Sequence, residues 1–166
     1  MIKKFIKRIL AFFNEIYIYE SNKNKKKITY RNFSLKQFMS QNLIKDKTIY
    51  QYLKIGNKFK RFKKNQILFV LLFKKQPVCF GWMNKKPSWK ITEINKIIIK
   101  KDTFILYDFF TDLNFRNRGF YTKILNLIKN IKTNNKFLIY CLKNNESSKK
   151  GISNAKFILV KKIKGL

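Results

Sequence analysis

The residues best suited to chemistry in this 166-residue chain lie between Phe109 and Leu125. An apolar stretch ends there, a short basic loop containing Gly119 follows, and an amphipathic stretch begins. A strand, loop and helix in this order expose backbone N–H groups at the positive end of the helix dipole. Such a loop can bind a phosphate or diphosphate, and Arg116 and Arg118 can add charge-assisted hydrogen bonds. The alternative is an ordinary strand-to-helix connection with two solvated arginines.

Two familiar phosphate-binding patterns do not fit this loop. It lacks the Gly-Lys-Ser/Thr ending of a P-loop and the three-glycine spacing of a dinucleotide-binding turn. Even so, Arg116 and Arg118 are two of only five arginines among the 39 Lys and Arg residues of the chain. Gly119 also permits a positive φ or a close approach of ligand to backbone. These features favour an anionic ligand.

A second polar segment, residues 145–148 (Asn-Glu-Ser-Ser), follows one predicted helix and one predicted strand. Taken alone, Asn145 and Ser148 are typical of the N-cap of a helix. Their side chains could also bond a ligand held at the first loop. The residues by themselves leave both interpretations open.

Residues 116–121 (Arg-Asn-Arg-Gly-Phe-Tyr) resemble the acyl-CoA diphosphate loop of the GNAT acyltransferases, Arg/Gln-x-x-Gly-x-Gly/Ala. Tyr121 departs from the last position. Residues 107–111 (Tyr-Asp-Phe-Phe-Thr) resemble a branch of that superfamily found near surface-polysaccharide biosynthesis, and residues 79–82 (Cys-Phe-Gly-Trp) are similar to it too. Residues 145–157 resemble the family's Asn-x-x-Ser/Ala segment that ends in Gly-Phe, with Lys156 in place of the glycine, so we expect that turn to be built differently. The resemblance covers about residues 65 to 163.

This resemblance implies acetyl-CoA as cosubstrate, no metal, and an amine that attacks the thioester directly with the help of a base. The acceptor would be a small, anionic molecule such as a nucleotide-linked amino sugar. The pantetheine arm would lie between two strands that part beside Thr111. The implied coenzyme contacts are Phe110, Thr111, Arg116, Asn117, Arg118, Gly119, Phe120, Tyr121, Thr122, Asn145 and Ser148.

Candidate bases are few, because the chain has no histidine and only eight acidic residues. Asp108, Asp112 and Glu93 fall near the predicted site. Asp108 lies in an apolar strand, where an unpaired carboxylate is costly, so it acts as the base or pairs with a lysine.

The usual position of the family's tyrosine acid is Ile152. Tyr121 is therefore a candidate acid, with Tyr107 and Tyr140 as alternatives. Otherwise thiolate departure needs no acid, or the activity is lost.

The elements that position these residues follow from the apolar pattern. We expect an α/β domain with one mixed, mostly antiparallel sheet and helices on both faces. Residues 67–73 and 78–83 are predicted to form a hairpin. The other predicted strands are 15–20, 91–99, 103–111, 137–142 and 157–163. The predicted helices are 33–43 with Ser34 as a cap, 46–54, 119–131 with Ile124, Leu125, Leu127, Ile128 and Ile131 inward, and 147–155.

The length fits a single domain, in which residues 65–163 form the acyl-CoA-binding core and residues 1–64 a variable part on the acceptor side. Residues 1–13 are basic and apolar at helical spacing. They form either an amphipathic helix packed on the domain or a surface helix that touches anionic lipid. We expect a cytoplasmic protein, at the inner membrane surface in the second case. Two cysteines in apolar runs and the lack of histidine predict buried free thiols and argue against a zinc site.

The net charge of +31 suggests a nucleic-acid partner. However, the charge is mostly lysine, which is spread along the chain together with other residues of A/T-rich codons. Arginine is the better residue for phosphate and base recognition. We therefore expect acyl transfer, with a nucleic-acid-binding module and a non-catalytic membrane-peripheral module as alternatives.

Overall fold

The computed structural model describes residues 14–21, 28–99, 102–131 and 136–165. The predicted helix over residues 1–13 lies outside these ranges. The strands are β1 (Glu15–Ser21), β2 (Phe33–Phe38), β3 (Ile67–Phe73), β4 (Gln76–Asn84), β5 (Ser88–Ile91), β6 (Lys96–Ile99), β7 (Thr103–Thr111), β8 (Lys136–Leu142) and β9 (Phe157–Lys164). The α-helices are α2 (Lys47–Lys54), α3 (Phe120–Ile131) and α4 (Glu146–Asn154), and the 3-10 helices are η1 (Gln41–Leu43), η2 (Ile55–Lys64) and η3 (Leu113–Phe115).

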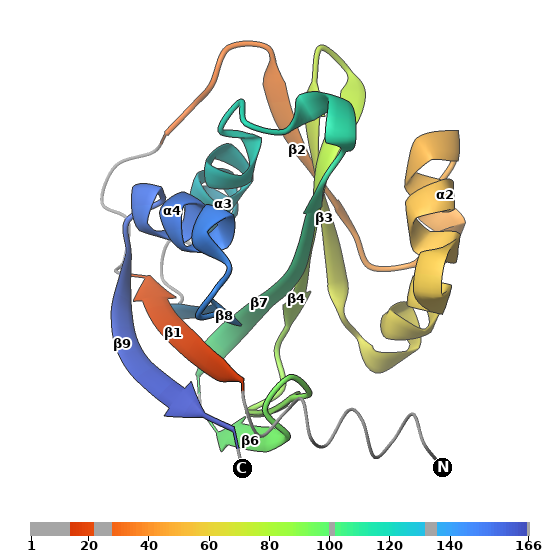
Figure 1. Ribbon diagram of the computed structural model, residues 1–166. Coiled ribbons are helices and arrows are strands. Elements are labelled where there is room, and N and C mark those ends of the chain that lie inside the picture. Colours follow the sequence, from red (N-terminus) through yellow and green to blue (C-terminus); the bar gives the residue numbers. More distant parts are fainter. Residues whose placement is uncertain (1–13, 22–27, 100–101, 132–135, 166) are drawn as a thin grey trace.

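The main sheet is mixed, as expected, with strand order β2-β3-β4-β7-β8-β1-β9. All neighbours are antiparallel except β7 and β8, which α3 connects in the parallel sense. The first strand lies between β8 and the last strand, and the Gly165 amide donates to the Asn14 carbonyl. The two ends of the described chain therefore meet in the sheet (Figure 1).

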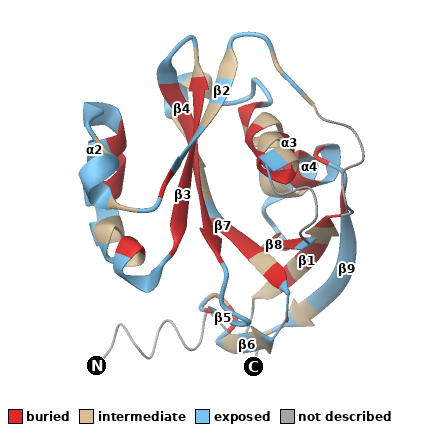
Figure 2. Cartoon of the chain, turned by 180° about the vertical axis from the view of Figure 1, so that it is seen from behind, coloured by how far each residue is buried: buried red, intermediate tan, exposed pale blue. Residues whose placement is uncertain are grey.

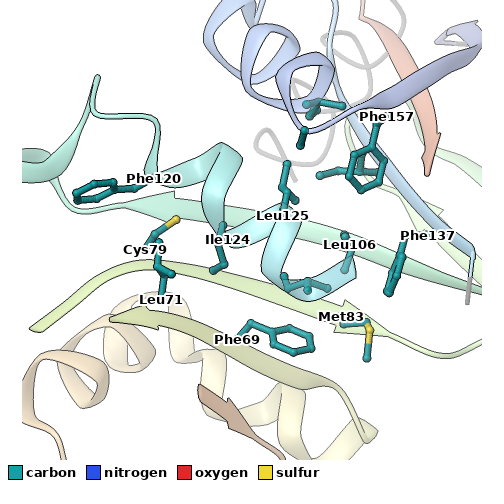
Figure 3. Packing of buried hydrophobic residues seen from close by; sticks show 14 of the residues in the cluster. Phe69, Leu71, Cys79, Met83, Leu106, Phe120, Ile124, Leu125, Phe137 and Phe157 are labelled. Atoms are coloured by element: carbon teal, nitrogen blue, oxygen red, sulfur yellow. The ribbon is translucent and has the colours of Figure 1, made fainter. Parts of the chain in front are cut away.

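Helices cover both faces of the sheet: α2 lies on one side, and α3 and α4 lie on the other (Figure 1). On the α3 side, Ile124, Leu125 and Ile128 pack against Phe69, Leu71 and Met83 of the central hairpin (Figure 3). On the α2 side, an aromatic cluster is built around Trp82, Phe80 and Tyr52. The central strands are buried between these layers, whereas β9 is largely exposed (Figure 2). On α3 the prediction was wrong for Ile131, which is 41% exposed at the helix end, and Leu127 is half-buried.

Residues 33–43 do not form the predicted helix. Residues Phe33–Phe38 form β2, which pairs along its whole length with β3. Phe33 and Leu35 face the α3 side, and Phe38 faces the α2 side. This is the alternation of side chains between the two faces of a strand. The wholly apolar β3 needs a neighbouring strand on each side. Pairing with β3 therefore decides the conformation of residues 33–38. Ser34 is an exposed strand residue rather than a cap.

Residues 91–99 are not one strand either. Residues 92–95 form a turn between β5 and β6, with Asn95 at φ 53°, and the two short strands make a separate hairpin. The remaining predicted elements are present within one or two residues of their expected ends. In the described ranges, no helix is long and apolar enough to cross a membrane.

Candidate active site

The sheet opens between β7 and β8. The two strands pair from Thr103 and Lys136 as far as Leu106 and Ile139, and no further. Beyond that point β7 continues with β4, and β8 continues with β1. The two strand ends therefore diverge into a V-shaped gap, as predicted beside Thr111.

A bulge in β7 sets the shape of this gap. Asp108 has φ 49°, and residues 108 and 109 together face the single residue Gly81 on β4. The Phe109 ring lies over Gly81 so closely that a Cβ there would be 2.1 Å from the ring. Only glycine leaves room for the ring, which explains the Gly in the Cys-Phe-Gly-Trp segment.

A cleft of about 1580 Å³ runs through the gap. We call its two parts the amide half and the aromatic half, according to the elements that line them. The amide half is lined from the β7–α3 loop, α3 and α4 by Thr111, Phe115, Arg116, Asn117, Gly119, Phe120, Tyr121, Thr122, Asn145, Ser147, Ser148, Lys150, Gly151 and Asn154. The aromatic half is lined from η2, the β5–β6 hairpin and the α2-side faces of β7 and β8 by Lys60, Arg61, Lys64, Gln66, Trp89, Lys90, Thr92, Glu93, Tyr107, Asp108, Phe110 and Tyr140.

In the amide half, several backbone N–H groups form no hydrogen bond within the described chain. The amides of residues 117–122 have no acceptor within the described chain; the first bonded amide of the helix is that of Lys123, which donates to the Gly119 carbonyl at 3.1 Å. Asn117 and Gly119 have φ of 60° and 70°, which turns the chain sharply into α3. Free amides at the start of a twelve-residue helix make an anion site.

The two loop arginines differ in position. Arg116 lines the cleft, where its Nε donates to the Thr111 carbonyl at 3.3 Å and its guanidinium lies over the Phe110 ring. Arg118 does not line the cleft; its guanidinium lies over the Phe115 ring. The structure thus brings every predicted coenzyme contact into the cleft lining except Arg118.

Tyr121 fills the space between α3 and α4. Its ring packs against Phe109, with ring centres 5.3 Å apart, and a Cβ on Gly151 would be 2.4 Å from it. Burial raises the pKa of Tyr121 well above its usual range. Ile152, the family's usual acid position, is fully buried next to Gly151. The ring of Tyr121 therefore lies against Gly151 of α4, the residue before Ile152.

Asn145 is the N-cap of α4. Its side-chain oxygen accepts from the Ser148 amide at 3.0 Å and from the Ser147 hydroxyl at 3.1 Å. The cap interpretation is therefore confirmed, while Asn145 and Ser148 both also line the cleft. At the other end of α4, Lys156 has φ 61°, so a lysine here adopts the left-handed conformation that glycine favours.

The aromatic half is built around Arg61. Its guanidinium contacts Asp108 Oδ2 at 2.5 Å and lies over the rings of Trp82 and Tyr107, 5.0 and 5.2 Å from their centres. Asp108 is therefore paired with a cation, which was the alternative to its being a free base. The partner is an arginine and not the predicted lysine. The Trp82 indole donates to the Tyr52 hydroxyl at 3.1 Å, and this hydroxyl donates at 3.5 Å to the carbonyl of Asp108 at the bulge.

Four further hydrogen-bonding side chains line this half. The Tyr107 hydroxyl donates to Gln66 Oε1 at 2.5 Å, and the Trp89 indole donates to the Tyr140 hydroxyl at 3.2 Å. The amide nitrogen of Gln66 donates to no acceptor within the described chain and is open to the cleft, since no buried side-chain nitrogen or oxygen there lacks a partner. Burial and, to a lesser extent, the charge of Glu93 raise the pKa of Tyr140 to about 12.

The three candidate bases are separated by the fold. Asp108 and Glu93 both line the aromatic half. Asp112 does not line the cleft; its carboxylate accepts from the Asn114 amide at 3.0 Å and caps η3. Sequence reasoning missed Arg61, Gln66 and Trp89, which come from segments far from the loop. Arg61 carried one signal, since it is among the few arginines of the chain.

Both cysteines are free, as predicted. Cys79 is fully buried and accepts a hydrogen bond from the Thr111 hydroxyl at 3.2 Å, and burial raises its pKa to about 12. Cys141 lines the cleft, and burial raises its pKa to about 11. Within the described residues, no group of His, Cys, Asp and Glu gathers as metal ligands do.

Known structures with a similar fold include an acetyltransferase of the GNAT family from Colwellia psychrerythraea, with a TM-score of 0.59 at 12% identity over 89% of this chain. A protein of unknown function from Staphylococcus epidermidis matches with a TM-score of 0.58 at 10% identity over 90% of the chain. A proposed GNAT acetyltransferase from Novosphingobium aromaticivorans matches with a TM-score of 0.57 at 6% identity over 90%.

This likeness establishes the fold: the chain has the mixed α/β fold of the GNAT acetyltransferases. The chain spans only 53%, 59% and 61% of the lengths of these three proteins. No protein-family model and no curated protein sequence matches it.

Proposed function

We propose that this chain transfers an acetyl group from acetyl-CoA to an amine of a small acceptor. The observation that carries the proposal is the set of free amides over residues 117–122, at the head of α3 and beside the gap between β7 and β8. Two negative charges of a diphosphate suit this position, because the amides and the helix dipole act together there. The GNAT fold of the chain supports the same reaction.

The residues present fit the coenzyme. The loop amides and Arg116 hold its diphosphate, and Asn117 and Gly119 supply the left-handed turns that aim the amides. Ser148 and Asn145 line the path of its pantetheine arm. Acetyl-CoA brings an activated thioester carbonyl. The free edges of β7 and β8 past Leu106 and Ile139 offer backbone groups that orient the thioester.

The chain's own residues then handle the protons. The attacking amine gives up one proton, and Asp108 or Glu93 in the aromatic half is placed to accept it. The departing sulfur needs one proton, and we assign its donation to Tyr121. Burial raises the pKa of Tyr121, so its hydroxyl stays protonated, and its ring lies against Gly151, the residue before Ile152.

The acceptor enters from the aromatic half. Lys60, Arg61, Lys64 and Lys90 give this half an excess of positive charge over Asp108 and Glu93. The rings of Trp89 and Tyr107 pack together at an angle of 45° and form an aromatic wall. A nucleotide-linked amino sugar has an anionic diphosphate and planar and apolar faces that suit both features. We therefore propose this class of acceptor.

The test has a binding arm and a transfer arm. We expect acetyl-CoA to raise the melting temperature of the purified protein, and we expect coenzyme release, followed with a thiol reagent, to be faster with UDP-glucosamine than with glucosamine. Unchanged melting at about millimolar acetyl-CoA, together with no release above background for either amine, would refute acyl transfer. Binding and transfer that favour glucosamine would refute only the nucleotide-linked acceptor.

A further inference from the structure

In the aromatic half, Arg61 and Asp108 bind each other in an ion pair, although one is a candidate anion ligand and the other a candidate base. Asp108 is a candidate base, and its Oδ2 is held by the Arg61 guanidinium at 2.5 Å. A carboxylate bound in this way has to be released, at least in part, before it can accept a proton from an amine. The pair is not sealed in the interior, since the side chains are 27% and 38% exposed, so a solute in the cleft reaches both partners.

The arginine can exchange partners without leaving its place. Its guanidinium lies over the rings of Trp82 and Tyr107, and these two contacts do not depend on Asp108. Stacking on aromatic faces leaves the guanidinium edge with its N–H donors in the plane available to an anion. Arg61 therefore stays at the wall of the cleft whether Asp108 or another anion accepts its hydrogen bonds.

A second donor points to an anion at the same wall. Gln66 is 6% exposed and lines the cleft; its oxygen is taken by the Tyr107 hydroxyl, whereas its amide nitrogen has no partner within the described chain. No buried side-chain nitrogen or oxygen among the described residues lacks a partner, so this nitrogen is open to the cleft, where water or a ligand accepts its hydrogen bond. Lys60 and Lys64 line the same side and add positive charge.

We propose that an anionic group on the acceptor binds Arg61 and Gln66, displaces Asp108 from Arg61, and so frees Asp108 to accept the proton of the attacking amine. This inference rests on the proposed acyl transfer and adds to it a condition on the acceptor. In the step, nitrogen forms its bond to the thioester carbon, the carbon–sulfur bond breaks, and the amine proton passes to Asp108. The departing sulfur takes its proton from Tyr121. An acceptor without a phosphate or carboxylate leaves Asp108 paired and reacts slowly.

The experiment compares three amines that share one sugar ring: glucosamine without an anionic group, glucosamine 1-phosphate, and muramic acid, which bears a carboxylate. In the wild type we expect kcat/KM to be about tenfold or more higher for at least one of the two anionic amines. The comparison of glucosamine 1-phosphate with muramic acid then shows whether Arg61 and Gln66 prefer a phosphate or a carboxylate.

The decisive variant is Arg61→Met, which keeps an apolar stem over the rings and removes the charge. We expect it to lose the preference for the anionic amine and to react faster with glucosamine than the wild type, because Asp108 is now free. Lys64→Met is the matched control: it lines the same half but holds no ion pair among the described residues, and we expect it to keep at least part of the preference. Asp108→Asn should lower kcat with every amine while acetyl-CoA still raises the melting temperature.

Three results would overturn the inference. One is a wild type that favours neither anionic amine over glucosamine, another is an Arg61→Met variant that is no faster with glucosamine than the wild type, and a third is an Asp108→Asn variant with unchanged kcat. If acetyl-CoA binds and is turned over in these cases, the proposed function stands and only the inference fails. If the wild type neither binds nor turns over acetyl-CoA, both fail together.

Discussion

The amide half and the aromatic half of the cleft are built in different ways. The amide half presents backbone amides from one continuous loop, residues 117–122, at the head of α3. The aromatic half presents side chains from segments as far apart as Arg61, Trp89 and Tyr140. A site made of backbone amides forms wherever one loop has the right conformation. A site made of distant side chains forms only when the whole domain is folded. The first suits a ligand of fixed chemistry, and the second suits one that differs between proteins.

The largest expected effect tests the amide half. Gly119→Glu should weaken acetyl-CoA binding about 1,000-fold, because it puts a carboxylate where the diphosphate binds and forces φ 70° on a residue with a side chain. The measurement is the thermal shift with increasing acetyl-CoA. Gly56→Glu is the matched control: Gly56 has φ 66° and open space around it, but it does not line the cleft. Equal loss of binding in both variants would mean that strain, not the anion site, is responsible.

The next effect asks which half supplies the acid. Tyr121→Phe should lower kcat about 100-fold and leave the acetyl-CoA thermal shift in place, because the ring still packs between Phe109 and Gly151. Tyr140→Phe is its counterpart in the aromatic half, where the lost hydroxyl accepts from Trp89. If Tyr140→Phe lost the larger share of kcat, the proton donor would belong to the aromatic half, and the division of roles between the halves would be wrong.

The same difference explains how much could be predicted from the sequence. The loop, Gly119 and the N-cap at Asn145 are local patterns, so their type and spacing indicated an anion site and the elements around it. Residues 33–43 were predicted wrongly because pairing with β3 outweighs their local spacing. The Arg61–Asp108 pair joins residues 47 apart in sequence, and no local pattern contains such a contact.

A third prediction concerns the bulge in β7 at residues 108 and 109. Gly81→Ala should destabilise the protein by about 1–3 kcal/mol, because its Cβ would meet the Phe109 ring at 2.1 Å. The free energy of unfolding in urea measures this. Phe109→Leu removes the ring edge, so the double variant should be more stable than the sum of the two single changes predicts. Strict additivity of the two changes would show that Gly81 is not there to accommodate the ring.

The smallest effect concerns the turn after α4, next to the amide half, where a residue with a side chain adopts a left-handed conformation. Lys156 follows α4 with φ 61° and is exposed, and a left-handed residue with a side chain costs roughly 1–2 kcal/mol. Part of this cost returns as the extra entropy that glycine has in the unfolded chain. Lys156→Gly should therefore raise the free energy of unfolding by about 0.5–1 kcal/mol, and acetyl-CoA binding should not change. Lys156→Ala removes the same side chain but keeps the strain, so its stability should stay near that of the wild type. If alanine stabilised as much as glycine, the gain would come from loss of a lysine charge in a chain of net charge +31, and the turn geometry would not be the cause.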